Sequence, residues 1–289
     1  MKAIIFGISG QDGFYLTKIL AKNGIEIVGV SRNDQTHVIG DVANFSFIEQ
    51  LIKDHQPAYI FHLAANSSTR HALLFENYDA ITTGTINILE AVYRHSKNCK
   101  VFISGSGLQF VNNGSPISET DEFEARDAYS MARIQSVYAA RYFRSLGIKT
   151  YVGYFFHHDS PLRNEHHLNM QIVKTALKIK TGAAEKLAIG DTQVIKEFNH
   201  AYDMMAAIWC LIRQESVFEA VIGSGIGYKI ADWIQICFDA LAIDDKVEVI
   251  SGYKPEFSAL VSNPATIRSL GWEPMYDIYY LANDMIANG

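Results

Sequence analysis

The chain of 289 residues has only three cysteines, Cys99, Cys210 and Cys237, and they lie far apart. An odd number at these spacings argues against a disulfide framework and is typical of the reducing cytoplasm. Basic residues are also few, because 25 Lys and Arg stand against 31 Asp and Glu and give a net charge of −6. No basic cluster is present, so we expect no nucleic acid as a partner.

Long apolar runs are missing as well. The longest fall well short of the ~20 residues that a membrane-spanning helix needs, so no membrane partner is expected. The first residues show neither the charged leader nor the cleavage site of a signal peptide. Hydrophobic residues still make up 48% of the chain, enough for one large α/β domain or a nucleotide-binding domain with a smaller partner.

The first half of the chain alternates between short apolar runs and helix-like segments. Strands are expected at 3–6, 26–30, 59–63, 101–104 and 149–155, and helices at 14–23, 45–54, 83–96 and 129–146. This alternation predicts an α/β fold with a Rossmann-type, doubly wound parallel sheet that binds its ligand at the carboxyl ends of the strands.

From residue 157 the pattern changes to helices and loops with a few short strands. We therefore expect a dinucleotide-binding domain over residues 1–156 and a smaller, mostly helical substrate-binding lobe over 157–289. Segments near 190–215 are expected to return to the first domain.

A glycine pattern, G-x-x-G-x-x-G, directly follows the first expected strand and leads into a helix. Glycines let the backbone turn sharply and approach a pyrophosphate, whose charge the first N–H groups of the helix receive. The pattern predicts a nucleotide cofactor site, whereas the alternative is a glycine-rich turn without a ligand. The cofactor-binding residues expected here are Gly7, Ser9, Gly10, Gln11, Asp12 and Gly13.

The end of the second strand indicates which dinucleotide binds. NAD-selective sites usually carry an acidic residue there, whereas a basic residue accommodates the 2′-phosphate of NADP. Ser31 and Arg32 therefore favour NADP(H) over NAD(H), unless Arg32 is simply a solvated loop residue. Asp41, followed by Val42, is placed to accept a hydrogen bond from the adenine amino group. Small residues after the next strand permit close approach of the cofactor: Leu63, Ala64 and Ala65.

Three residues suit hydride-transfer chemistry. Ser106 lies at a strand end, and Tyr129 and Arg133 lie four residues apart near the start of a helix, on one face. In such a pair the cation stabilises tyrosinate, which can take a proton from a substrate hydroxyl while hydride leaves the same carbon for nicotinamide. A nearby serine hydroxyl can hydrogen-bond the reacting oxygen.

Several motifs together carry a family resemblance. The glycine loop is close to G-I-T-G-Q-D-G, residues 156–161 resemble F-N-H-E-S-P with Arg163 following, and 196–201 parallel R-D-W-G-H-A before Asp203. Residues 262–264 and 270–272 match the closing segment. The chain thus resembles, over nearly its whole length, the extended short-chain dehydrogenases/reductases and more narrowly the GDP-mannose 4,6-dehydratase branch.

The resemblance implies an enzyme that acts on a nucleotide-activated sugar, with a GDP-sugar favoured. Together with Ser31, Arg32 and the few cysteines, it predicts an NADP-dependent enzyme of the cytoplasm. Its reaction would begin with hydride transfer from sugar C4, assisted by Tyr129. The helix that carries this tyrosine commonly builds a dimer interface in the family, so a homodimer or homotetramer is expected. The expected substrate-binding residues are Ser67, Ser106, His157, Arg163, Lys174, Lys196 and Arg268.

Departures from the family pattern concern the chemistry itself. The family lysine is Arg133, which stays cationic but cannot pass a proton on. Ser106 aligns with the catalytic threonine and Leu108 with the glutamate that removes the C5 proton, a task leucine cannot perform. Gln109 would face the opposite side of a strand. Reduction or epimerisation at C4 without dehydration therefore stays open, as does a non-catalytic nucleotide-binding homologue.

Four histidines lie close together in the sequence and suggest a metal site. A metal needs convergent ligands, however, and adjacent residues on an extended loop tend to diverge. We expect no metal and instead a polar rim around the sugar pocket. The histidines are His157, His158, His166 and His167.

Overall fold

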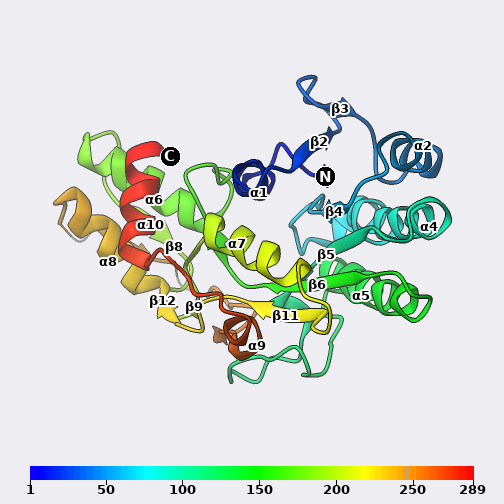
Figure 1. The fold of residues 1–289 in the computed structure, drawn as a ribbon. Helices are drawn as coiled ribbons and strands as arrows, with labels where there is room; N and C mark the ends of the chain where they lie inside the picture. The colour runs from blue at the N-terminus through cyan, green and yellow to red at the C-terminus, as the bar shows by residue number, and fades with distance from the viewer. Residues whose placement is uncertain (245, 251) are drawn as a thin grey trace.

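A seven-stranded, entirely parallel sheet forms the centre of the protein in a computed structural model that describes residues 1–244, 246–250 and 252–289 (Figure 1). Its strand order is β11-β6-β5-β4-β1-β2-β3. This arrangement confirms the Rossmann-type α/β fold. The strands are β1 (Lys2–Phe6), β2 (Glu26–Ser31), β3 (Val38–Ile39), β4 (Tyr59–His62), β5 (Lys100–Ser106), β6 (Thr150–Phe155) and β11 (Glu219–Ile222).

Helices cover both faces of this sheet (Figure 1). One face carries α1 (Gln11–Lys22) and α7 (Ala201–Ile212), and the other carries α2 (Phe45–His55), α4 (Gly84–His95) and α5 (Ala128–Ser145). Because both faces are buried, the strands are mostly apolar rather than alternating with polar residues.

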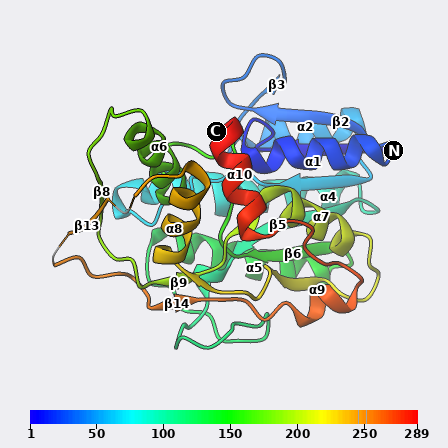
Figure 2. The same ribbon diagram turned by 90° about the vertical axis from the view of Figure 1, so that its left-hand side faces the viewer.

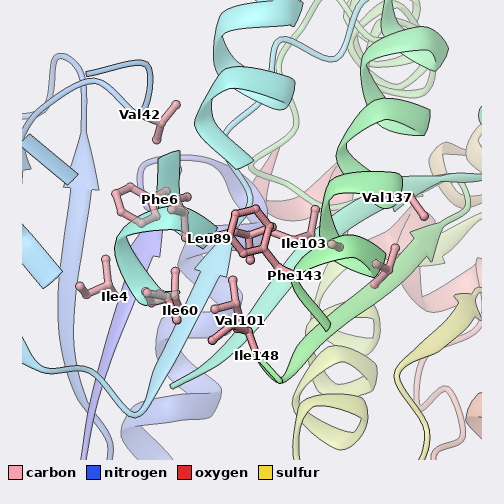
Figure 3. Packing of buried hydrophobic residues seen from close by; sticks show 14 of the residues in the cluster. Ile4, Phe6, Val42, Ile60, Leu89, Val101, Ile103, Val137, Phe143 and Ile148 are labelled. Atoms are coloured by element: carbon pink, nitrogen blue, oxygen red, sulfur yellow. The ribbon is translucent and has the colours of Figure 1, made fainter. Parts of the chain in front are cut away.

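Strand β1 shows how side chains are shared between the two faces. Ala3 and Ile5 pack with the α1 and α7 residues, whereas Ile4 and Phe6 point to the other face, where Val101, Leu89 and their neighbours surround them (Figure 3). Successive strand residues point in opposite directions, so one run of four apolar residues supplies both cores.

The chain reverses its order in the sheet between β1 and β4. These two strands are neighbours, with Phe6 paired to His62, while β2 and β5 continue the sheet in opposite directions. The next backbone step keeps them together, since the Leu63 N–H donates to the Phe6 carbonyl at 3.0 Å. A ligand crevice is expected at this topological switch point, outside the carboxyl ends of the strands.

A second core lies beside the sheet, among three helices that are grouped together in Figure 2. It includes the stacked rings of Phe198 and Trp233, whose centres are 5.1 Å apart. The helices are α6 (Leu168–Lys180), α8 (Ile230–Leu241) and α10 (Ile278–Asn288). Between them the chain returns to the sheet over residues 201–222, as α7 and β11. The boundary at residue 156 and the return near 190–215 stay predictions.

Short elements complete the described chain. They are β7 (His158–Asp159), β8 (Leu187–Ile189), β9 (Ile195–Lys196), β10 (Asn199–His200), β12 (Tyr228–Lys229), β13 (Val247–Val249), β14 (Ala259–Leu260), α3 (Leu74–Asn77), α9 (Ala265–Ser269), the 3-10 helices η1 (His71–Leu73) and η3 (Gly107–Gln109) and the π-helix η2 (Tyr78–Thr83). No helix within the described ranges is both long and apolar enough to cross a membrane.

Candidate active site

The glycine loop joins β1 to α1 in a conformation that only glycine adopts easily. Gly7 has φ of +89°, and a Cβ on it would lie 2.8 Å from the Ala64 backbone nitrogen. A Cβ on Gly13 would run into Ile8, so α1 packs closely on the loop. Helix α1 begins at Gln11, and its N-cap residue Gly10 has no side chain to cap the first N–H groups. The open helix N-terminus favours an anionic group.

A cavity of about 530 Å³ lies over this loop and is called the glycine-loop cavity below. It brings together residues from the ends of β1, β2 and β4, as a dinucleotide crevice requires. The expected cofactor residues that line it are Gly7, Ser9, Gly10, Ser31, Arg32, Asp41, Val42, Leu63, Ala64 and Ala65. Gln11 instead lines a neighbouring cavity of about 670 Å³ together with Ser9 and Arg163.

An acidic residue that the sequence patterns did not single out also lines the glycine-loop cavity. The Ser9 hydroxyl lies 3.0 Å from Ser31 Oγ and 3.2 Å from Asp34 Oδ2. Hydrogen bonds from the side chain and backbone N–H of Thr36 hold the pKa of the Asp34 carboxyl below its usual value. A negative charge therefore lies where the sequence suggested room for a 2′-phosphate. The signal was a D-x-T turn just after the strand, which places the aspartate back over the strand end.

A second cavity, of about 200 Å³, lies at the ends of β4, β5 and β6 and is called the tyrosine cavity below. It shares Leu63 with the glycine-loop cavity. The structure brings the three expected catalytic residues together in its wall with several expected substrate contacts. The expected site residues that line it are Asp12, Leu63, Ser67, Ser106, Tyr129, Arg133, His157 and Arg163.

Helix α5 positions Tyr129 and Arg133. Asp127 caps the helix by accepting a hydrogen bond from the Ser130 N–H at 2.8 Å, which places Tyr129 in the first turn. Tyr129 is 8% exposed and Arg133 4%. The Arg133 guanidinium carbon lies 5.0 Å from the centre of the Tyr129 ring, so the expected shared face is found.

Arg133 is held by the neighbouring strand rather than by an acid. Its Nη1 donates to the carbonyl and to the hydroxyl of Ser104, the latter at 2.7 Å. Its buried Nε has no hydrogen-bond partner within the described parts of the chain, and no carboxylate there forms an ion pair with Arg133. Arg133 therefore brings a positive charge without a carboxylate partner to the wall of the tyrosine cavity.

Strand β5 ends at Ser106 and turns into η3, which corrects the expectation that the strand continues. The Ser106 N–H donates to Gln109 Oε1 at 2.9 Å, and the Leu108 N–H donates to Ser106 Oγ at 3.2 Å. Gln109 is therefore fully buried beside the strand end. Its side chain is kept from the substrate because it turns inward to the Ser106 N–H, not because it lies on the opposite side of a strand. Leu108 lines the tyrosine cavity at the position where the family pattern has glutamate.

Three histidines of the next segment, His157, His158 and His167, line the tyrosine cavity. His158 Nε2 also lies 3.1 Å from Asp12 Oδ1. Burial lowers the pKa of His157 to about 3 and that of His167 to about 4, so both rings are neutral near pH 7. Within the residues that the structure describes, no three potential metal ligands cluster.

The remaining expected substrate contacts differ in position. Arg163 lines the tyrosine cavity and pairs with Asp159 at 3.1 Å. Lys196 is buried behind it, where its Nζ donates to Asn169 at 2.9 Å and burial lowers its pKa to about 8.

Two more expected contacts lie among other charged groups. Lys174 lies 3.8 Å from Glu165, and Arg268 pairs with Glu273 at 3.2 Å and donates to the Ser224 carbonyl. The structure does not bring Lys174, Lys196 or Arg268 into the wall of the tyrosine cavity.

Comparison with known proteins decides the family. The family model described as GDP-mannose 4,6 dehydratase matches residues 4–285. The chain belongs to this family. A GDP-mannose 4,6 dehydratase of Arabidopsis thaliana is 27% identical over 98% of this chain and 85% of its own length. The resemblance expected from the sequence is thus confirmed.

Solved structures confirm the fold of this family member. RMD from Pseudomonas aeruginosa in complex with NADPH superposes with a TM-score of 0.88, at 18% identity over 99% of this chain and 96% of that one. dTDP-glucose 4,6-dehydratase from Bacillus anthracis in complex with NAD gives 0.86, at 18% identity over the same shares of the two chains. Both are extended short-chain dehydrogenase/reductase folds, and between them they hold the two forms of the nicotinamide cofactor.

Proposed function

We propose that this protein is a nicotinamide-dependent enzyme that transfers hydride at C4 of a nucleotide-activated sugar, with NADP(H) as cofactor and a GDP-sugar as the favoured substrate. The observation that carries the proposal is the convergence of Ser106, Tyr129 and Arg133 on one cavity that adjoins the glycine-loop cavity. Family membership supports the substrate class.

Each of the three residues has a role in this proposal. The Tyr129 hydroxyl takes the proton of the C4 hydroxyl, and the nearby Arg133 cation favours the phenolate that does so. Ser106 hydrogen-bonds the C4 oxygen. When bound, the cofactor supplies the hydride acceptor or donor. The Gly7 turn and the open N-terminus of α1 hold its pyrophosphate.

The cofactor preference rests on two opposed charges. Arg32 and Ser31 line the glycine-loop cavity and support NADP(H). The Asp34 carboxylate, 3.2 Å from the Ser9 hydroxyl, opposes a 2′-phosphate. We propose that NADP(H) binds with the Arg32 side chain offsetting this carboxylate, and that NAD(H) is also accepted.

Oxidoreduction or epimerisation at C4 without dehydration is the second candidate function. Elimination of water requires a base for the C5 proton, and Leu108 occupies the place of the family glutamate. Asp12 also lines the tyrosine cavity, but it pairs with His158. Since hydride transfer needs only the groups present, this candidate fits the residues better, whereas the whole-chain similarity favours the dehydratase.

The test is to mix the purified protein with NADP or NAD and individual GDP- and UDP-sugars. Reduced-nicotinamide absorbance and product analysis are followed together. A 4-keto-6-deoxy sugar supports the dehydratase, and nicotinamide reduction without it supports oxidoreduction alone. Binding of cofactor and nucleotide sugar without any turnover or exchange of label at C4 would refute the enzymatic proposal and leave a binding protein.

We further propose a cytoplasmic homodimer or homotetramer. Tyr138 and Tyr142 on α5 are 59% and 61% exposed, so this helix offers two aromatic side chains to a second copy of the chain. Sedimentation equilibrium of the protein tests this assembly, and a monomer at micromolar concentration would exclude it.

A further inference from the structure

The hydroxyl of Ser104 connects two buried groups near Tyr129. It donates to the His62 carbonyl at 2.9 Å and accepts from Arg133 Nη1 at 2.7 Å. A serine hydroxyl carries one proton, so its donation to His62 leaves a lone pair fixed in the direction of Arg133. Ser104 is itself 2% exposed, so water does not compete for these bonds.

Arg133 depends on this contact because no carboxylate in the described parts of the chain pairs with it. A buried guanidinium without a carboxylate carries a large desolvation cost unless its N–H groups are bonded. Ser104 supplies both of the acceptors that the structure records for Nη1, one from its side chain and one from its backbone. His62, the other titratable group nearby, adds no charge, since burial and the Arg133 cation lower its pKa to about 4.

Strand geometry links this contact to the reaction. Ser104 and Ser106 lie two residues apart on β5 and therefore point to the same face of the sheet. Both line the tyrosine cavity with Tyr129, and Ser104 also bonds to the Arg133 guanidinium. The same strand end thus orients two of the groups that act on one phenol.

We infer that Ser104 is a positioning residue for the proposed hydride transfer: its hydroxyl and carbonyl hold the Arg133 guanidinium against the Tyr129 ring. The inference rests on the proposed function of Tyr129. The lysine of the family pattern has no planar guanidinium, so a residue that fixes the orientation of this group is needed only when arginine takes its place.

The experiment compares Ser104→Ala with Ser136→Ala as a matched control. Ser136 is also fully buried, but its hydroxyl donates to the Arg133 backbone carbonyl rather than contacting the guanidinium. Ser104→Thr retains the hydroxyl, and Arg133→Met removes the charge that Ser104 would hold. Thermal unfolding of every variant separates loss of folding from loss of function.

Ser104→Ala is expected to lower kcat about 10-fold at neutral pH, to leave KM within about twofold, and to move the acid limb of the pH–rate profile up by roughly 1 pH unit. Ser104→Thr should restore at least half of the activity, and Ser136→Ala should change none of these quantities. In the Arg133→Met background, Ser104→Ala should add no further loss. An equal loss in that background, or equal effects of the two alanine variants, would overturn the inference.

A second readout keeps this inference separate from the proposed function. Tyrosinate absorbance is titrated with pH, and the Tyr129→Phe trace is subtracted to isolate the Tyr129 signal. Ser104→Ala should move this signal to higher pH even when no sugar is turned over. An unmoved signal would contradict the positioning role, whereas unchanged turnover in Tyr129→Phe would instead contradict the proposed function.

Discussion

Asp12 in the first turn of α1 and His158 in the segment after β6 form an ion pair, with His158 Nε2 3.1 Å from Asp12 Oδ1. The same two segments meet again where the Ser160 hydroxyl donates to Gln11 Oε1 at 2.9 Å. The two motifs most specific to the family, Q-D in the glycine loop and H-x-S-P, therefore bind each other. This contact joins the cofactor loop to the segment that lines the tyrosine cavity.

This pair predicts a dependence of stability on pH. Burial alone would lower the pKa of His158, but the Asp12 carboxylate raises it above its ordinary value of 6.5. Burial opposes ionisation of Asp12, yet His158 keeps the pKa of that carboxyl below 3.8. The stabilisation is therefore full between these values, is lost as pH rises through the raised pKa of His158, and is also lost in strong acid.

His158→Gln should consequently lower the free energy of unfolding by about 2 kcal/mol at pH 5.5 and by clearly less at pH 8.5. Urea unfolding at both pH values measures the difference. His166→Gln, at an exposed position of the same segment, is the control and should change little at either pH. A His158→Gln effect that grows with pH would show that the ion pair with Asp12 does not supply this stabilisation.

The sheet illustrates what the sequence alone can predict. Short, mostly apolar runs mark β1, β2, β4, β5 and β6, because strands buried on both faces leave that local signature. The strand β3 has only two residues, and β11 has four and pairs with the distant β6, so neither carries a local signal strong enough to place it.

The candidate site can likewise be divided into features with a local sequence signal and features that depend on distant contacts. The glycine loop and the Tyr129–Arg133 spacing are local patterns and were predictable. The hydrogen bond between Ser104 and Arg133 depends on how β5 approaches α5. The position of the Asp34 carboxylate depends on how the loop after β2 folds back. The inward turn of Gln109 was missed because the strand was assumed to continue past Ser106.

Tyr129→Phe tests the proposed proton acceptor. The change removes one oxygen from a nearly buried ring, so packing against Ala132 and Ile81 should persist. Hydride transfer should fall at least about 1,000-fold, while the Kd for NADP(H) stays within about threefold. Single-turnover nicotinamide absorbance and cofactor fluorescence give the two quantities. Tyr142→Phe, at an exposed position of the same helix, should leave both unchanged.

Asp34→Asn tests cofactor selection. Removing the charge beside Ser9 and Ser31 should tighten NADP(H) binding about 10-fold, because the carboxylate no longer repels a 2′-phosphate, and should leave NAD(H) within about twofold. Fluorescence titration with both reduced cofactors, at fixed ionic strength and without sugar, measures the ratio. Asp239→Asn in α8 is the control for net charge, since Asp239 is exposed and pairs with Gln235. No change in the NADP/NAD ratio would show that the 2′ position lies elsewhere.

Leu108→Glu tests whether the missing carboxylate decides between oxidoreduction and dehydration. Leu108 lines the tyrosine cavity together with Ser106 and Tyr129, so a glutamate there reaches the space around the reacting sugar. Burial raises the pKa of such a carboxyl and suits it to take the C5 proton near neutral pH. The variant should form a 4-keto-6-deoxy sugar at a rate at least about 10-fold above the parent chain, at a stability cost of about 1–2 kcal/mol. Leu108→Gln has nearly the same size without the base, and mass spectrometry of the product should detect no gain with it. If the parent chain already dehydrates GDP-sugars and Leu108→Gln abolishes this, the leucine is not a lost base, and elimination depends on another group in the tyrosine cavity.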